Sequence, residues 1–596
     1  MVVQYFVAAD YCVLVVVLGI SSAIGVFFAW KDRRSTNNKE FLIGNRKLQL
    51  FPVTMSMIAS FLSAIAMLGV PAENFVHGSQ YLMNTVGVVI GIVLSAEVFM
   101  PVFYDMEMIS VNQYLEKRFN SVVLRKFASA LSIIQTCFYL GVVLYGPSLA
   151  LGSVTGLPVW LSIIVNGSVC AFYTTIGGIK AVVWTDVMQL LLMVTGFLIV
   201  TIQACMMLGG VSPVFTIADQ QGILEFFDFS FDLQKTFTFW SVVIGSSVIW
   251  TMTFCTNQTM VQRYCGLSSA SRARKALYTN MAGVSGLLSL ASFCGLALFA
   301  LYHKCDPVKA RIITKYDQLM PHFVMDTLSH LPGLSGLFVT AVYSGSLSTM
   351  SSGYNALAAI TWEDFLKPRL NLSPSGVMRA TKIIAASYGV LAILVAFLSG
   401  TIPSILQATF ITSGAVGGAS GAVFFIGLLL PWCGSKTALA SMITGMCTAS
   451  WVAIGSLIYP KRPVAAHTSL EGCAFNYTLQ APDPVEYRSG GIFELYHISY
   501  FWVPVISFFV TMILAVVTTA ALGFKNSADV DPSLIAPGLR NFYLRTRQST
   551  TLSESKSTVK LSEKEDWASE KQPESIKNGH INYGMTNDSE AQSTPM

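Results

Sequence analysis

The chain has 596 residues, of which 53% are hydrophobic and only 12% are charged. Soluble globular proteins carry about 25% charged residues, so this composition excludes a disordered chain, a collagen and a coiled coil, and disfavours a soluble enzyme. The formal net charge is only +5, and no basic stripe with interleaved aromatic residues argues for nucleic-acid binding. The composition predicts an all-α polytopic membrane protein.

Thirteen apolar runs of about 20 residues, the length that crosses a bilayer core, follow one another along the chain. They lie at 10–30, 50–71, 82–104, 127–151, 158–177, 182–207, 238–261, 277–302, 333–361, 383–402, 405–431, 437–459 and 500–523. Residues 1–9 precede the first run, and a loop at 460–499 separates the last two helices of 437–523. Residues 524–596 are rich in Ser, Thr, Glu and Lys, which predicts a disordered tail.

Lysine and arginine in the loops predict the orientation. With the N-terminus outside, the inner loops hold 20 of these residues and the outer loops hold 8. We therefore expect a multi-pass protein of the plasma membrane, with residues 1–9 and 460–499 extracellular and the tail 524–596 cytoplasmic.

Two features of the predicted outer loops agree with this orientation, and the end of the tail carries a further motif. Asn476 begins a glycosylation sequon, Asn476-Tyr-Thr478, in the loop after the twelfth span. Cys305 and Cys473 both lie in outer loops, so a disulfide between them is a hypothesis. The chain ends in Ser593-Thr-Pro-Met596, which resembles a ligand of a PDZ-domain protein, although an arbitrary tail end is the alternative.

Charged side chains at membrane depth are costly and are therefore functional candidates. Glu97 and Asp186 are the conspicuous ones, and we expect no Lys or Arg clearly within a span. An anionic substrate would then be met by cotransported cations, helix N-termini and neutral donors instead of a buried basic residue.

Polar segments interrupt three of the apolar runs. In the ninth run, nine of the thirteen residues from Tyr343 to Asn355 are Ser, Thr, Tyr or Asn, and such hydroxyls suit Na⁺ as hard ligands. The second run, from Met55 to Pro71, is rich in small and hydroxyl residues and is typical of a helix broken in mid-membrane. The seventh run turns polar from Trp250 to Gln258. Helix packing and interhelical hydrogen bonds remain the alternative for each segment.

These residues carry a resemblance to the sodium/solute symporter family, from about residue 10 to residue 523. The chain is most similar to the branch of sodium-coupled monocarboxylate, multivitamin and iodide transporters, and the segment from Ser95 to Tyr104 favours the monocarboxylate members. The motifs that carry it are Ala59-Ser-Phe61, Leu68-Gly-Val-Pro71, Phe99-Met-Pro-Val-Phe-Tyr104, Gln113-Tyr-Leu-Glu-Lys-Arg-Phe119, Gly177-Gly-Ile-Lys-Ala-Val-Val-Trp-Thr-Asp186, Val261-Gln-Arg-Tyr264 and Tyr343-Ser-Gly-Ser-Leu-Ser-Thr349.

The resemblance implies a LeuT-like core of two inverted five-helix repeats, at 50–207 and 238–431. It implies that Asp186 lies on the path by which sodium leaves. The sodium-binding positions that it implies are the carbonyls of Ala59, Leu62 and Gly345 and the hydroxyls of Ser348 and Thr349. The positions that it implies for a second sodium or the substrate are Ser63, Ala66, Tyr139, Trp250 and Gln258. Ala66 stands where the iodide transporter has Gln, which counts against iodide.

The sequence thus predicts a Na⁺-coupled symporter for a small monocarboxylate, working by alternating access, with Na⁺ as the cotransported ion and no cofactor. A carrier of biotin, pantothenate or lipoate is the near alternative. Iodide transport is a further alternative, as is a channel or a non-transporting sensor on the same fold. No paired nucleophile and base suggests an enzyme.

Overall fold

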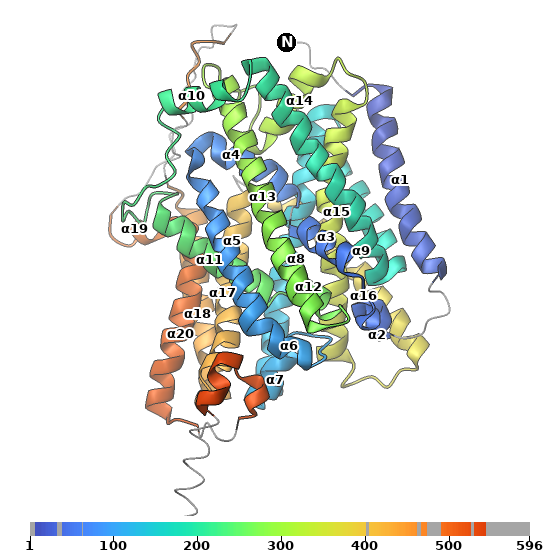
Figure 1. Ribbon diagram of the computed structural model, residues 1–596, viewed down its shortest axis with the longest axis vertical. Coiled ribbons are helices and arrows are strands. Elements are labelled where there is room, and N and C mark those ends of the chain that lie inside the picture. Colours follow the sequence, from blue (N-terminus) through green and yellow to red (C-terminus); the bar gives the residue numbers. More distant parts are fainter. Residues whose placement is uncertain are drawn as a thin grey trace, which may run out of the picture. The chain divides into compact units, whose positions relative to one another are not determined.

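The computed structural model describes residues 6–31, 38–61, 63–400, 405–461, 467–473, 490–525 and 530–543. Within these ranges the regular structure is helical, and the one isolated β-bridge joins Leu48 and Leu267. Contacts divide the chain into two units, Met1–Arg540 and Asn541–Met596. The fold described below is that of the first unit (Figure 1).

Among the described residues, nine helices are long and apolar enough to cross a membrane, and two bent helix pairs raise this number to eleven. Helix α9 contains 50 residues, which is about 75 Å at 1.5 Å per residue and too long for one crossing. It is interrupted at Gly178, whose φ of 64° is left-handed, so α9 supplies two spans. Helix α15 is as long as a span but more polar. If α9 is counted as two spans and α15 as one more, the described residues hold as many as thirteen spans, the number predicted from the sequence.

The long helices are α1 (Ala8–Lys31), α8 (Val122–Thr155), α9 (Val159–Leu208), α13 (Ala270–Tyr302), α15 (Leu334–Ile360), α16 (Pro374–Ser399), α17 (Ile405–Leu429), α18 (Ser435–Ile458) and α20 (Trp502–Leu522). The bent pairs are α3 (Leu50–Phe61) with α4 (Ala64–His77), and α11 (Phe239–Cys255) with α12 (Gln258–Cys265). A further span is α5 (Asn84–Leu94), which continues through a π-turn at Ser95–Phe99 into α6 (Met100–Asp105). The connecting helices are α2 (Asn38–Ile43), α7 (Gln113–Phe119), α10 (Ser212–Gln220), α14 (Leu319–Leu328) and α19 (Phe493–Tyr496).

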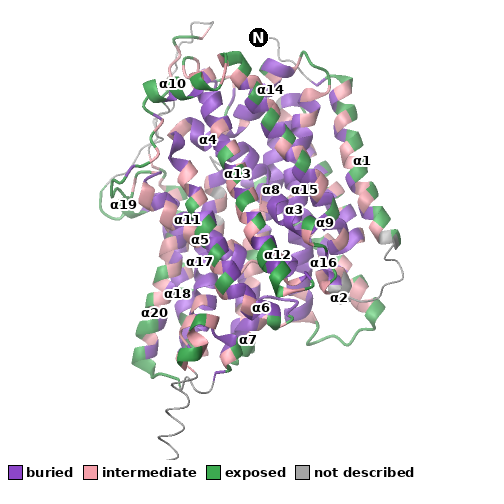
Figure 2. Ribbon diagram, viewed as in Figure 1, coloured by how far each residue is buried: buried purple, intermediate pink, exposed green. Residues whose placement is uncertain are grey.

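Helix α15 lies inside the bundle, where it packs against α9, α8, α1, α16, α3 and α4. Every residue from Phe338 to Ile360 is buried, including the polar run from Tyr343 to Asn355. Helices α1 and α20 instead carry many exposed apolar side chains and lie toward opposite edges of the view in Figure 2. The polar ninth run therefore faces other helices and not lipid, which removes the cost of its hydroxyls.

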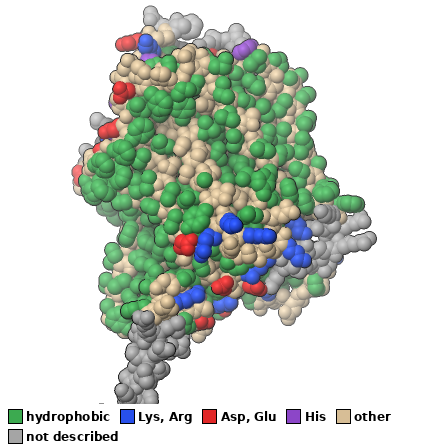
Figure 3. Space-filling model, in the orientation of Figure 1, with side chains coloured by type: hydrophobic (Ala, Val, Ile, Leu, Met, Phe, Trp, Pro, Cys, Tyr) green, Lys and Arg blue, Asp and Glu red, His purple; other side chains and the backbone are tan. Residues whose placement is uncertain are grey.

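The surface of the bundle suits a lipid environment. Figure 3 shows hydrophobic side chains over most of one face, with Lys and Arg gathered toward its lower end. Exposed apolar residues on the long helices include Val15 and Leu191, which are 67% and 64% exposed. Such residues are stabilised by acyl chains rather than by water.

One close helix contact fixes the register of the site described below. Helix α5 packs tightly against α11, and a Cβ placed on Gly91 would lie 2.6 Å from the backbone nitrogen of Thr251 and from the carbonyl carbon of Trp250. Only glycine fits there, because any side chain would push the two helices apart. The position of Trp250 is therefore set by backbone packing.

Part of the expected disordered tail is folded. Residues 530–540 form a short 3-10 turn at Pro532–Leu534 and bury Leu534 and Ile535. The Tyr114 hydroxyl on α7 donates to the Leu534 carbonyl at 3.0 Å, and the Ala536 amide donates to the Leu428 carbonyl at 3.2 Å. The expectation of disorder from residue 524 onward is wrong for this segment, because its few apolar residues find a partner surface.

Candidate functional site

Two helix breaks place free backbone groups in the interior. The α3/α4 pair is bent by 51° and the α11/α12 pair by 50°. Ser63 caps the N-terminus of α4 by accepting a hydrogen bond from the Ile65 amide, and Asn257 caps α12 by accepting one from the Thr259 amide. Helix N-termini carry partial positive charge, so each break offers a favourable position for an anion.

A cluster of hydroxyls and carbonyls joins the end of α3 to the middle of α15. The Thr349 hydroxyl lies 3.1 Å from both the Ser60 carbonyl and the Gly345 carbonyl. The Ser60 and Ser348 hydroxyl oxygens are 3.4 Å apart. Hard oxygen ligands of this kind suit Na⁺.

The expected sodium positions can be compared with this cluster. Gly345, Ser348 and Thr349 belong to it on α15, and the buried Ala59 directly precedes Ser60 on α3. Leu62 lies outside the described residues. The cluster thus contains an assembled set of oxygen atoms from two helices that are almost 290 residues apart in sequence.

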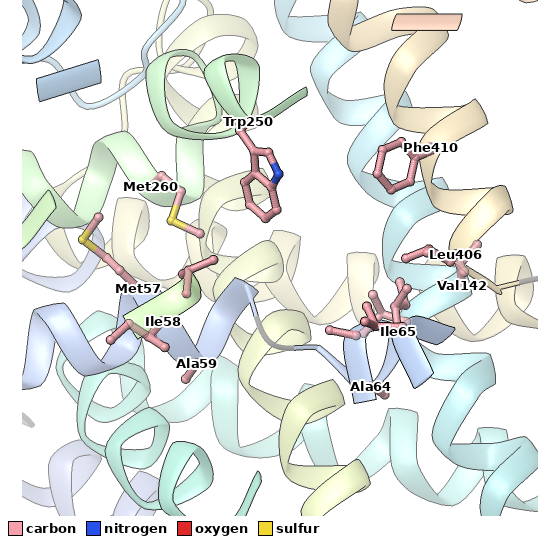
Figure 4. Packing of buried hydrophobic residues seen from close by; sticks show 14 of the residues in the cluster. Met57, Ile58, Ala59, Ala64, Ile65, Val142, Trp250, Met260, Leu406 and Phe410 are labelled. Carbon is pink, nitrogen blue, oxygen red and sulfur yellow. The ribbon is translucent and has the colours of Figure 1, made fainter. Parts of the chain in front are cut away.

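An internal cavity of about 190 Å³ adjoins the cluster. All five positions expected for a second sodium or the substrate line it, namely Ser63, Ala66, Tyr139, Trp250 and Gln258. In Figure 4, Trp250 and Phe410 lie on opposite sides of the open space, and Ile65 and Leu406 lie on the same side as Phe410. No charged residue is among the described residues that line this cavity, so its walls are apolar with a few neutral polar groups.

Gln258 does more than line the cavity. Its carboxamide oxygen accepts a hydrogen bond from the Val111 amide at 2.8 Å, and its nitrogen donates to the Ile109 carbonyl at 2.6 Å. These bonds join α12 to the segment between α6 and α7. Both polar groups of the Gln258 side chain are therefore bonded to the backbone of this segment, which the sequence did not indicate.

The side chains of Tyr139 and Ser63, two of the positions implied by the resemblance, lie in contact. The hydroxyl of Tyr139 on α8 interacts with Ser63 at the start of α4. The ring of Trp250 packs on that of Phe61, with centroids 4.0 Å apart. The first helix break is thus contacted from α8 on one side and from α11 on the other.

A buried ion pair corrects one expectation from the sequence. Arg263 on α12 is 2% exposed and donates to the Asp186 carboxylate at 3.2 Å, to Ser56 at 2.8 Å and to Ser60 at 2.6 Å. The expectation that no basic residue is buried at membrane depth is wrong, because the bend between α11 and α12 brings Arg263 inward. Since Arg263 does not line the cavity, it is not placed to pair with an anion there.

The two carboxylate oxygens of Asp186 differ in their hydrogen bonds. Its Oδ2 accepts from Ser56 and Arg263, whereas its Oδ1 has no hydrogen-bond partner among the described residues. Asp186 also interacts with Ser348 of the hydroxyl and carbonyl cluster. Glu97 behaves differently, because it lies at the surface and contacts Tyr278 and Arg274 at 2.9 and 3.3 Å.

Away from the cavity, Cys305 and Cys473 form a disulfide in the structure, with Cα atoms 4.9 Å apart. Asp306 beside it accepts from the Tyr316 hydroxyl at 3.0 Å and from the Thr468 hydroxyl at 2.7 Å. These bonds attach the segment 467–473 to the loop after α13. Asn476 and the C-terminal residues 593–596 lie outside the described residues.

Several cavity residues were missed from the sequence. Asn84 and Gln135 line the cavity with amide groups, and Leu406 and Phe410 form an apolar wall. A lone amide near the end of an apolar run is a weak signal, because such residues are usual at membrane interfaces. The apolar residues carry no signal beyond membrane burial.

Comparisons with known proteins bear on this arrangement. The model of the Sodium:solute symporter family matches residues 41–445. The human sodium-coupled monocarboxylate transporter 1 is 38% identical over 549 residues, covering 89% of this chain and 90% of that protein. The human sodium-coupled monocarboxylate transporter 2 is 37% identical, covering 93% and 90%. The human sodium/iodide cotransporter is 38% identical, covering 76% and 71%.

Among solved structures, a Na⁺-coupled sialic acid symporter in a substrate-bound outward-open state is similar, with a TM-score of 0.71. The alignment covers 87% of this chain and 99% of that one at 22% sequence identity, so the likeness establishes the fold. The fold is the LeuT-like arrangement expected from the resemblance, and the helices, the bent pairs and the relatives together define a multi-pass membrane protein. The chain belongs to the sodium:solute symporter family.

Proposed function

We propose that this protein is a Na⁺-coupled symporter that imports a small monocarboxylate, of the lactate, short-chain fatty acid or nicotinate class, by alternating access. The observation that carries the proposal is an uncharged cavity at a helix break, directly beside a cluster of hydroxyl and carbonyl oxygens. Relatives named as sodium-coupled monocarboxylate transporters support it.

Sodium is assigned to the cluster between α3 and α15. The proposed ligands are the carbonyls of Ala59, Leu62 and Gly345 and the hydroxyls of Ser348 and Thr349. Asp186 is proposed to receive the ion on its way to the cytoplasm, and two observations support this role: its Oδ1 has no hydrogen-bond partner among the described residues, and its side chain interacts with Ser348. The remaining positions, proposed for a second sodium or the substrate, are Ser63, Ala66, Tyr139, Trp250 and Gln258.

The charge of the substrate needs compensation in a site of low dielectric constant. Arg263 is already paired with Asp186, and the cavity lining is uncharged in the part of the chain that the structure describes. Bound Na⁺ and the N-termini of α4 and α12 would supply the positive potential. The substrate anion therefore binds best after Na⁺, which couples the two fluxes.

The size of the cavity favours a substrate of few atoms. Its volume of about 190 Å³ lies below the roughly 300–1,000 Å³ typical of sites for drug-sized ligands. The multivitamin carrier ranks second, because the reported relatives at 37–38% identity include two named as monocarboxylate transporters and none named as a vitamin carrier. Iodide is disfavoured because Ala66 offers no polar group where the iodide transporter has Gln.

The coupling energy can be bounded. A charge that crosses about 60 mV releases roughly 1.4 kcal/mol. A tenfold Na⁺ gradient adds about 1.4 kcal/mol. One Na⁺ per monovalent anion is electroneutral and leaves only the second contribution, so strong accumulation requires more than one Na⁺ per substrate.

We further propose an extracellular N-terminus and a cytoplasmic C-terminus in the plasma membrane. The Cys305–Cys473 disulfide supports this orientation, because disulfides persist on the oxidising side of a membrane. Glycosylation of Asn476 and binding of a PDZ-domain protein to the last four residues are consistent with the same topology.

The proposal is tested by uptake in cells that express the chain, with Na⁺ or with an equal concentration of an impermeant cation. Lactate, butyrate, nicotinate, biotin, pantothenate, iodide and glucose are compared as labelled substrates. Saturable, concentrative and Na⁺-dependent uptake of the small carboxylates is expected. Uptake of biotin alone would favour the multivitamin carrier. Non-saturable flux would indicate a channel, and binding without flux would indicate a sensor.

A further inference from the structure

Asn84 is a buried amide at the edge of the cavity. It does not belong to the proposed sodium cluster. It is the first residue of α5, is 1% exposed and lines the cavity. Its carboxamide oxygen accepts a hydrogen bond from the indole nitrogen of Trp250 at 2.7 Å. Asn84 and Trp250 thus connect two helices across one wall of the site.

The contact with Trp250 decides which way the amide is turned. An indole nitrogen can only donate, so the oxygen of Asn84 must face Trp250 and the amide nitrogen must point elsewhere. That nitrogen has no partner with hydrogen-bond geometry among the described residues, although the hydroxyl of Tyr81 lies near it. Buried donors in folded proteins are nearly always paired, so an unpaired one beside a cavity points to a ligand.

The donor is also held rigidly. Trp250 is buried and packs on Phe61 and Phe254, with ring centroids 4.0 and 5.8 Å away. The close approach at Gly91 prevents α5 from shifting along α11. A donor fixed before the ligand arrives loses little freedom on binding, which favours specific recognition.

We propose that the Nδ2 group of Asn84 donates a hydrogen bond to a carboxylate oxygen of the transported anion and helps to select carboxylates. This inference rests on the proposed function and adds the residue that recognises the substrate headgroup. A carboxylate oxygen is a strong, directional acceptor, and a hydrogen bond to it is stronger than one between neutral groups. Trp250 acts on the substrate through Asn84 and is in this respect a positioning residue.

The test compares Asn84→Asp, Asn84→Ala and Asn84→Ser with the wild-type protein, using labelled butyrate at saturating Na⁺. Asn84→Asp keeps an oxygen for Trp250 but replaces the donor with a negative charge, so the KM should rise more than tenfold, about 1.4 kcal/mol or more. Asn84→Ala should raise the KM about tenfold, and Asn84→Ser should raise it less because a hydroxyl can still donate. The Na⁺ concentration for half-maximal activation should change less than twofold.

Asn74→Asp is the matched control. Asn74 is also a buried amide, but it donates to the Val70 carbonyl at 2.8 Å and does not line the cavity. Its substitution should leave the KM for butyrate within twofold. If a variant is retained inside the cell, Na⁺-dependent binding of labelled butyrate to the detergent-solubilised protein replaces uptake.

Different results would overturn the proposed function and the proposed role of Asn84. If wild-type protein shows no Na⁺-dependent uptake of any carboxylate, the proposed function and this inference are both wrong. If wild-type protein transports butyrate but all three Asn84 variants bind it with affinity within twofold of wild type, only this inference is overturned. A loss that is equal for butyrate and for Na⁺ activation would also overturn it, because that pattern indicates a structural role.

Discussion

The sodium cluster predicts a specific effect of removing one hydroxyl from α15. Thr349→Val keeps the shape of the side chain but deletes Oγ1, which lies 3.1 Å from two backbone carbonyls. In the proposed site this oxygen is one of five Na⁺ ligands. Hydrogen bonds to charged groups contribute about 1.5–3 kcal/mol, and we take the same range for the lost ligand. The Na⁺ concentration for half-maximal uptake should therefore rise about 10- to 150-fold.

The assay measures initial uptake of butyrate against Na⁺ concentration, with surface expression followed in parallel. Thr340→Val is the control, because Thr340 lies on the same helix, is fully buried and donates to the Gly336 carbonyl in the same i−4 pattern. It should leave Na⁺ activation within twofold, and Thr349→Ser should restore most of the affinity. Identical Na⁺ activation curves for Thr349→Val and wild type would refute the assignment, as would an equal loss in Thr340→Val.

Three further outcomes follow from other contacts. Gln258→Leu breaks both bonds to the segment 109–111, so cysteine probes there should react faster from the cytoplasmic side, and unchanged reactivity would show that these bonds do not hold the segment in place. Arg263→Met leaves Asp186 buried without its cation and should destabilise the solubilised protein by about 3–5 kcal/mol, measured by thermal unfolding. The double variant that adds Asp186→Asn should recover part of this loss. The double substitution Cys305→Ser and Cys473→Ser should lower the free energy of unfolding by about 2–5 kcal/mol. Cys12→Ser, at an exposed free thiol, is the control and should leave it unchanged. Equal melting temperatures for the double variant and the wild type would contradict a stabilising disulfide.

The sequence predicted the elements that depend on local composition. The polar run of the ninth span was recognisable because nine hydroxyl or amide residues are costly in lipid, and the structure buries them inside the bundle. The break in the second run was recognisable from its small and hydroxyl residues, and the seventh run, which turns polar from Trp250 to Gln258, is the other bent pair. The five cavity positions came from family resemblance, and all of them line one cavity.

Other features depend on tertiary contacts that hydropathy does not encode. Arg263 lies two residues beyond the end of the predicted seventh span, and only the bend before α12 makes it buried. Asn84 is an ordinary interfacial amide until Trp250 is placed beside it. Ile535 lies in a polar region without periodicity, yet it is 1% exposed because α7 and α17 offer it a surface.

The folded segment at 530–540 has a practical consequence for work on this protein. A truncation at residue 523, where the last span ends by hydropathy, would remove the cover from Tyr114 and from the end of α17. Such a shortened protein should express poorly even though every transmembrane helix is intact. Affinity tags, fluorescent proteins and stabilising fusions are therefore better attached after residue 540, where the first unit ends.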